Sequence, residues 1–163
     1  MAITIAEFSP EYADAVVELI VPIQREEFGV AITAEDQPDL RDIPGFYQRE
    51  RGNFWIACHE GRVVGSVALL DIGSRQAALR KMFVERDFRG SGHGTAGLLL
   101  ATLLDWARGH RIREIYLGTT AQFLAAHRFY EKNGFVEIPK SDLPVAFPVM
   151  AVDSKFYRLT MGG

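Results

Sequence analysis

Apolar and polar residues alternate every two positions in several short stretches of the chain and follow a helical period in longer ones. This alternation predicts a strand over residues 3–8, and short β-prone runs next to turns predict strands over residues 54–59, 63–70, 77–84, 114–119, 135–138 and 150–159. The helical period predicts helices over residues 9–23, with Pro22 kinking or ending the helix, and over 39–47, 94–108 and 121–132. Strands and helices are therefore combined in a mixed α/β fold of the α+β type.

The two halves of the chain predict different strand pairing. In the first half, a turn at residues 60–62 joins two strands into a hairpin and a further strand follows Gly73-Ser74, so antiparallel pairing is expected. In the second half, a strand ending at Val84 is followed by the helix over 94–108 and by a strand beginning at Glu114. A helix that connects two strands in this way implies parallel neighbours with a right-handed crossover.

The bulk composition is that of one ordinary globular domain, which we expect to span residues 1–163. Of 163 residues 48% are hydrophobic, and the formal net charge of -3 gives no general attraction for nucleic acid. Cys58 is the only cysteine, and the longest apolar run, 96–104, is far shorter than the roughly 20 residues of a membrane-spanning helix. No nucleic-acid or membrane partner is predicted, and a cytoplasmic location is expected.

Three glycines stand between the strand that ends at Val84 and the helix that begins near Thr95. Residues 89–94, Arg-Gly-Ser-Gly-His-Gly, place several backbone N–H groups at a helix N-terminus, where they lack a partner within the helix. The helix dipole and the missing Cβ atoms allow a phosphate to approach these amides closely. The segment predicts an anion-binding turn, and a tight turn without a ligand is the alternative.

The same turn also matches the dinucleotide-binding pattern. Residues 92–97 satisfy G-x-G-x-x-G between a predicted strand and a predicted helix. That pattern needs an acidic residue near the end of the next strand to hold a ribose, and residues 117–120 are Leu-Gly-Thr-Thr instead. A nucleotide-binding protein is therefore the disfavoured interpretation of this turn.

Two motifs in the second half of the chain resemble the GNAT superfamily of N-acetyltransferases. Residues 89–94 match its Gln/Arg-x-x-Gly-x-Gly/Ala motif, and residues 79–84 look like its fourth strand. Residues 126–135, AHRFYEKNGF, look like its segment from a helix to a strand, which ends in Tyr-Glu-Lys-x-Gly-Phe. Two such motifs in the expected order are more specific than either alone, and the chain is identified as a small single-domain member.

The resemblance implies a fold and a cofactor. The fold is a mostly antiparallel sheet of about six to seven strands flanked by about four helices, whose two parallel strands splay apart to admit acetyl-CoA. By resemblance, the end of the fourth strand, Met82, Phe83 and Val84, carries the backbone that pairs with the pantetheine arm. The pyrophosphate is implied to lie on the turn and the first helical residue, which are Arg89, Gly90, Ser91, Gly92, His93, Gly94 and Thr95.

Acetyl transfer from a thioester to an amine needs an unprotonated amine, a polarised carbonyl and a proton for the departing thiolate. Tyr130 matches the family tyrosine near the sulfur, which implies a general acid, and packing in the core is the alternative role. The chain departs from the family at Phe123, where many relatives carry an asparagine, and at Ala78, where some carry a glutamate base. The base is left open among Glu85, Asp87, the pair Glu26-Glu27 and a water chain.

Other chemistry-bearing residues give no second site. Cys58 and His59 are adjacent on a predicted strand, so their side chains point to opposite faces and do not form a nucleophile and its base. The four histidines show no metal-ligand spacing, and no metal is expected. They are His59, His93, His110 and His127.

The implied function is an N-acetyltransferase that passes an acetyl group directly from acetyl-CoA to a primary amine of a small molecule or peptide. The resemblance places the acceptor site at residues 24–47 and 140–149. The first of these segments is rich in acidic residues, which favours a cationic amine. A non-catalytic module that binds acyl-CoA as a sensor is the alternative. The sequence alone does not give the oligomeric state, and the resemblance allows a homodimer because relatives are often dimers.

Overall fold

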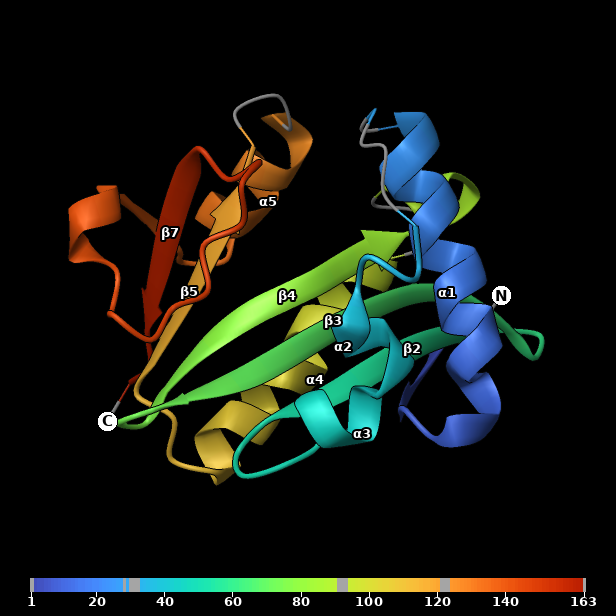
Figure 1. The fold of residues 1–163 in the computed structure, drawn as a ribbon, viewed down its shortest axis with the longest axis horizontal. Coiled ribbons are helices and arrows are strands. Elements are labelled where there is room, and N and C mark those ends of the chain that lie inside the picture. Colours follow the sequence, from blue (N-terminus) through green and yellow to red (C-terminus); the bar gives the residue numbers. More distant parts are fainter. Residues whose placement is uncertain (1, 28, 30–32, 91–93, 121–123, 163) are drawn as a thin grey trace.

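The computed structural model describes residues 2–27, 29, 33–90, 94–120 and 124–162. Within these residues the chain forms a mixed sheet of seven strands (Figure 1). Its strand order is β1-β2-β3-β4-β5-β7-β6, and all neighbours are antiparallel except β4 and β5. The strands are β1 (Thr4–Glu7), β2 (Asn53–His59), β3 (Arg62–Gly73), β4 (Gln76–Val84), β5 (Glu114–Thr119), β6 (Val136–Ile138) and β7 (Lys155–Thr160).

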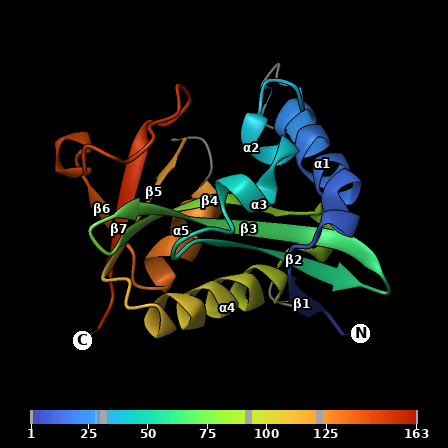
Figure 2. The same ribbon diagram turned by 60° about the horizontal axis from the view of Figure 1, so that its bottom comes forward.

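One layer of helices covers each face of the sheet (Figure 2). The helices are α1 (Ala13–Pro22), α2 (Pro38–Arg41) and α3 (Ile43–Phe46) on one face, and α4 (Thr95–Gly109) and α5 (Leu124–Lys132) on the other. Side chains of β2 alternate between the layers, since Phe54 packs in the cluster beneath α1 and Trp55 in the cluster beneath α4. The predicted mixed and mostly antiparallel fold is confirmed.

Several helix boundaries follow the sequence signals, but the helix predicted over 39–47 is two short helices, α2 and α3, because Asp42 has a non-helical backbone and caps α3. A single turn of 3-10 helix over Pro10–Tyr12 leads into α1, which ends at Pro22 and passes into a π-helical turn over Ile23–Glu27. Proline removes a hydrogen-bond donor, so the α-helical pattern stops where the sequence predicts. The predicted start of the last helix at Ala121 lies outside the described residues. None of the helices in the described ranges is long and apolar enough to cross a lipid bilayer.

The last predicted strand is wrong at its beginning, because β7 starts at Lys155 rather than at Met150. Residues 150–153 form a turn in which the Met150 N–H donates to Asp153 Oδ2 at 2.9 Å and the Asp153 N–H donates to the Met150 carbonyl at 3.0 Å. An Asp side chain that accepts from nearby backbone stabilises a turn in competition with a strand. The apolar run from Met150 therefore does not extend β7.

The parallel pair in the centre of the sheet is short. β4 and β5 pair only at Gln76↔Glu114, Ala77↔Ile115 and Ala78↔Tyr116. Beyond these residues β4 stays paired with β3, and β5 stays paired with β7 as far as Thr119, so the two strands diverge toward their carboxyl ends (Figure 1). The sheet therefore opens between β4 and β5, as the predicted splay of the parallel strands requires.

Candidate active site

A β-bulge interrupts β4 just beyond its paired segment. Ala68 of β3 faces Arg80 and Ser66 faces Phe83, so β4 contains one more residue than β3 over this interval. Lys81 has φ of +54°, and its carbonyl accepts a hydrogen bond from Ser66 Oγ at 2.7 Å. A bulge cancels the alternation of side chains locally. As a result, the adjacent cations Arg80 and Lys81 both lie on the α1 face of the sheet.

Lys81 is the centre of a buried polar network beneath α1 and α2. Its Nζ lies 3.4 Å from Asp39 Oδ2, and the two side chains are 7% and 8% exposed. Lys81 also donates to Gln37 Oε1, and Tyr47 Oη donates to Asp39 Oδ2 at 2.6 Å. Burial lowers the pKa of Lys81 and the Asp39 carboxylate opposes that change. The network attaches the segment over 37–47 to the bulge of β4.

Arg80 lies beside this network, but its guanidinium is only partly buried. Its Cζ lies 5.8 Å from the Phe46 ring centroid and 5.9 Å from that of Tyr47, and its Nη2 lies 3.4 Å from Met150 Sδ. No carboxylate of the described residues lies within ion-pair distance of this guanidinium. Asp153 carries the next carboxylate along this surface, and Arg80 acts on its pKa only through a longer-range interaction. Arg80 is thus a cation held by rings and a weak sulfur acceptor.

The turn predicted to bind an anion before α4 is described at Gly90 and at Gly94. Gly90 has φ of +92° and Gly94 has φ of +65°, and nothing lies within 4 Å of the positions where their Cβ atoms would be. The N-terminus of α4 has no side-chain cap, so the first amides of the helix, beginning at Thr95, keep free donors. An anionic group fits this open and donor-rich position. The predicted residues Ser91, Gly92 and His93 lie outside the described residues.

Arg89 connects this turn to the end of β4. Its Nε donates to the Val84 carbonyl at 2.7 Å, while the side chain lies largely on the surface. That carbonyl is therefore already paired. The other predicted strand residues face different cores, because Met82 packs toward α4 and Phe83 toward α1. What β4 offers toward β5 is therefore its backbone edge, and the predicted pairing with pantetheine concerns that edge.

Tyr130, the predicted general acid, is 7% exposed on α5. Its ring makes edge contacts with Phe129 and Phe135, whose centroids lie at 5.7 and 5.5 Å, and it also lies near Tyr157 at 6.1 Å. Burial raises the pKa of its phenol well above the ordinary value. The ring therefore contributes to the core, and the hydroxyl stays protonated at neutral pH. Packing of the ring in the core therefore does not exclude a role of the hydroxyl as a proton donor.

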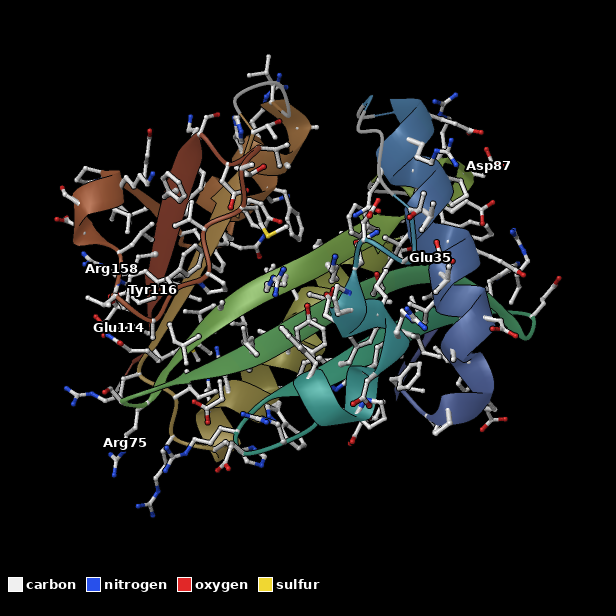
Figure 3. The ribbon with its side chains drawn as sticks, viewed as in Figure 1. Glu35, Arg75, Asp87, Glu114, Tyr116 and Arg158 are labelled. Atoms are coloured by element: carbon white, nitrogen blue, oxygen red, sulfur yellow. The ribbon has the colours of Figure 1, made fainter. Side chains whose placement is uncertain are left out.

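The residues considered as bases do not gather near Tyr130. Ala78 is fully buried against Tyr116 and Phe156, and its methyl group supplies no base. The carboxylates of Glu26, Glu85 and Asp87 line a surface pocket of about 560 Å³ to which no described residue of β5 or α5 contributes, and Asp87 lies beside α1, away from β5 (Figure 3). Glu85 is paired there with Arg62 at 2.6 Å. The side chain of Glu27 and all of Phe123 lie outside what the structure describes.

The remaining sequence candidates are structural. Cys58 packs toward α1, and His59 packs on the opposite face against Phe88 with a centroid distance of 5.0 Å, as predicted for neighbours on a strand. His127 Nε2 lies 2.8 Å from the Thr120 carbonyl. The structure brings together no group of three or more metal-ligating side chains within the described part of the chain.

The acidic residues of the predicted acceptor segment serve local structure. Asp39 pairs with Tyr47 and Lys81, Asp36 accepts from the Thr33 backbone and hydroxyl, and Asp42 caps α3 by accepting from the Gly45 amide. Arg80, Lys81 and Asp153 were missed by the sequence interpretation. Two consecutive charged residues within an apolar strand were the available signal, because only a bulge lets both avoid the core.

The chain resembles known proteins over its whole described fold. The model of the Acetyltransferase (GNAT) family matches residues 17–135. The chain belongs to the GNAT acetyltransferase family. A crystal structure of a GNAT-family acetyltransferase from Staphylococcus aureus Mu50 is 37% identical, with a TM-score of 0.92 and coverage of 98% of this chain and 99% of that one. An acetyltransferase structure from Streptococcus agalactiae is 32% identical, with a TM-score of 0.91 over 98% of each chain.

Curated relatives match a shorter stretch of this GNAT chain. An N-acetylaspartate synthetase from Xenopus tropicalis is 38% identical over 104 residues, which are 61% of this chain and 37% of that protein. The human N-acetylaspartate synthetase is 38% identical over 106 residues, or 64% of this chain and 34% of that protein. The chain thus spans little more than a third of the length of these relatives.

Proposed function

We propose that this chain transfers an acetyl group from acetyl-CoA to the primary amine of a small molecule or peptide, by direct attack within a ternary complex. The observation that carries the proposal is the divergence of β4 and β5 next to the uncapped N-terminus of α4. The two strands expose backbone edges at the end of the sheet where α4 offers free amides. An extended pantetheine arm with a pyrophosphate matches both features.

The residues proposed to hold acetyl-CoA divide into two groups. The edge of β4 over Met82, Phe83 and Val84 pairs with the amide-containing arm. The turn and helix start hold the phosphates with Arg89, Gly90, Ser91, Gly92, His93, Gly94 and Thr95. When bound, acetyl-CoA supplies the activated acetyl thioester. The chain contributes the alignment of that thioester with the amine and the exclusion of water, which together account for much of such an acceleration.

Tyr130 is the proposed general acid. Its phenol is protonated at neutral pH, as a tyrosine ordinarily is, and it donates that proton to the thiolate that leaves as the new amide forms, while the proton lost by the attacking amine restores the balance. The aromatic contacts with Phe129 and Phe135 hold the ring in one orientation. A fixed ring with a protonated hydroxyl is suited to this role, since general acids contribute mainly through position.

The proposal is tested by acetyl-CoA turnover, followed as release of free thiol, across a panel of amines. The panel contains aspartate, because relatives of this chain are named N-acetylaspartate synthetases, and also other amino acids, short peptides and polyamines. Amine-dependent thiol release with formation of the N-acetyl product, identified by mass spectrometry, is the expected result. Thermal stabilisation by acetyl-CoA without turnover on any amine would favour the alternative, an acyl-CoA sensor. This alternative is tested because Ala78 stands where some family members carry a glutamate base.

A further inference from the structure

The turn over residues 150–153 bridges β4 and β5 on the α1 face, beyond the point where these strands separate. Met150 contacts Arg80 of β4 through its sulfur atom at 3.4 Å. Asp153 Oδ2 lies 2.6 Å from the position that a Cβ of Gly118 on β5 would occupy. The turn therefore brings together a cation from one strand and a carboxylate that rests on the other.

Arg80 has donors to spare for a ligand. Its guanidinium carries several N–H groups, and within the described part of the chain its one hydrogen bond is the weak one to Met150 Sδ. The Phe46 and Tyr47 rings at 5.8 and 5.9 Å fix its position without satisfying those donors. Arginine presents a planar fork that matches a carboxylate with two parallel hydrogen bonds. An incoming carboxylate is the group that would satisfy it best.

Asp153 supplies the opposite charge a short distance away. One of its oxygens is held by the Met150 N–H at 2.9 Å, and the residue is only partly buried. Burial raises the pKa of its carboxyl, and the Met150 amide and Arg80 counteract that change. A Cβ at Gly118 would lie 2.6 Å from Asp153 Oδ2, so a side chain there would displace the carboxylate from this position. The carboxylate is thus set over the diverging end of β5.

We infer that Arg80 and Asp153 form the acceptor subsite for a free amino acid, with Arg80 binding its carboxylate and Asp153 binding its amine, which arrives as an ammonium group and gives up a proton before it attacks the thioester. This inference rests on the proposed function and deepens it by naming the substrate class. Among the described residues no ion pair joins the two side chains, and one stands on each side of the opening between β4 and β5, which leaves both charges to a zwitterionic ligand. The neighbouring cation Lys81 is neutralised by Asp39, whereas Arg80 has no carboxylate partner among the described residues. This assignment differs from the cationic acceptor that the acidic segment alone suggested.

The experiment compares an L-amino acid with its α-carboxamide, which lacks only the carboxylate charge. The ratio of their kcat/KM values is measured by thiol release in the wild-type chain and in Arg80→Gln and Arg80→Lys. Because the same two amines are used throughout, differences in amine basicity cancel when ratios are compared between variants. The wild-type chain is expected to prefer the acid. Arg80→Gln is expected to reduce the ratio by about tenfold to a hundredfold, since a charged hydrogen-bonding pair is lost, and Arg80→Lys to reduce it less.

Two further variants complete the design. Asp153→Asn is expected to lower kcat/KM about tenfold for both amines, because both carry the ammonium group. Arg108→Gln, on the far end of α4 where Arg108 pairs with Asp105 at 3.1 Å, is the matched control and leaves the ratio unchanged. Equal use of acid and amide by the wild-type chain would overturn the inference without any variant having to fold. An absence of thiol release with every amine would instead overturn the proposed function together with this inference.

Discussion

The two ends of β4 serve opposite purposes. Over Gln76–Ala78 the strand is paired on both edges, and Ala77 and Ala78 are fully buried. Beyond Leu79 it is paired with β3 alone, and it carries a bulge and two adjacent cations. A strand with two partners has no free backbone groups, whereas a strand that has lost one partner offers an edge to a ligand. One continuous strand can therefore be core at its beginning and candidate site at its end.

The strongest test of this contrast uses Tyr130, which α5 supplies from the far side of the opening. If the open end of β4 is where transfer occurs, Tyr130→Phe should lower kcat by about a hundredfold or more, because the departing thiolate loses its proton donor. The KM for acetyl-CoA should change little. Steady-state thiol release measures both. An unchanged kcat would show that the ring acts only through its packing against Phe135.

The bulge itself is tested through stability. Lys81→Ala leaves Asp39 buried without its cation, and it should lower the free energy of unfolding by about 3 kcal/mol, measured by urea denaturation. Lys155→Ala is the control, because the pair of Lys155 and Glu137 at 3.6 Å is substantially exposed and contributes about 1 kcal/mol at most. Equal losses in the two variants would mean that the bulge network contributes no special stability.

The turn after β4 gives a smaller effect. Gly90→Ala introduces a Cβ at φ of +92°, where L residues are strained, and it should raise the KM for acetyl-CoA by about tenfold by displacing the amides. Gly109→Ala, at the other end of α4 with open space around it, should leave this KM unchanged. Isothermal titration with coenzyme A provides an independent affinity. A similar affinity for both variants would argue against an anion site at this turn.

The last prediction is that ionisation of the Tyr130 phenol does not change kcat between pH 7 and pH 10. Burial raises the folded-state pKa of Tyr130 above its unfolded value of 10.0, so the phenol stays protonated and any loss of acid function begins only above that pH. A pH profile of kcat should therefore show no descending limb from Tyr130 between pH 7 and pH 10. A descending limb in that range that disappears in Tyr130→Phe would contradict the burial of this hydroxyl.

Local sequence patterns predicted most helices and strands, but not the places where a side chain from elsewhere changes the local structure. Pro22 ends α1, and Glu114–Thr119 is a strand with the predicted boundaries, because local sequence alone controls these features. The apolar run from Met150 was taken into β7, yet the Asp153 side chain makes a turn there. The acids of the segment over 33–42 predicted a surface for a cationic amine, which stays a prediction, but the partner that buries Asp39 is Lys81, a distant residue that periodicity does not reveal.

The sequence by itself determined the glycine turn before α4, the strand and helix order and the aromatic segment around Tyr130, since each depends on residues close together in the chain. The tertiary structure alone decided that Arg80 and Lys81 share a face, that Lys81 is paired with Asp39, and that Asp153 lies over Gly118. These depend on strand register and on a turn that joins two separated strands. Register and long-range contact are set by packing of the whole sheet, which no local window of sequence contains.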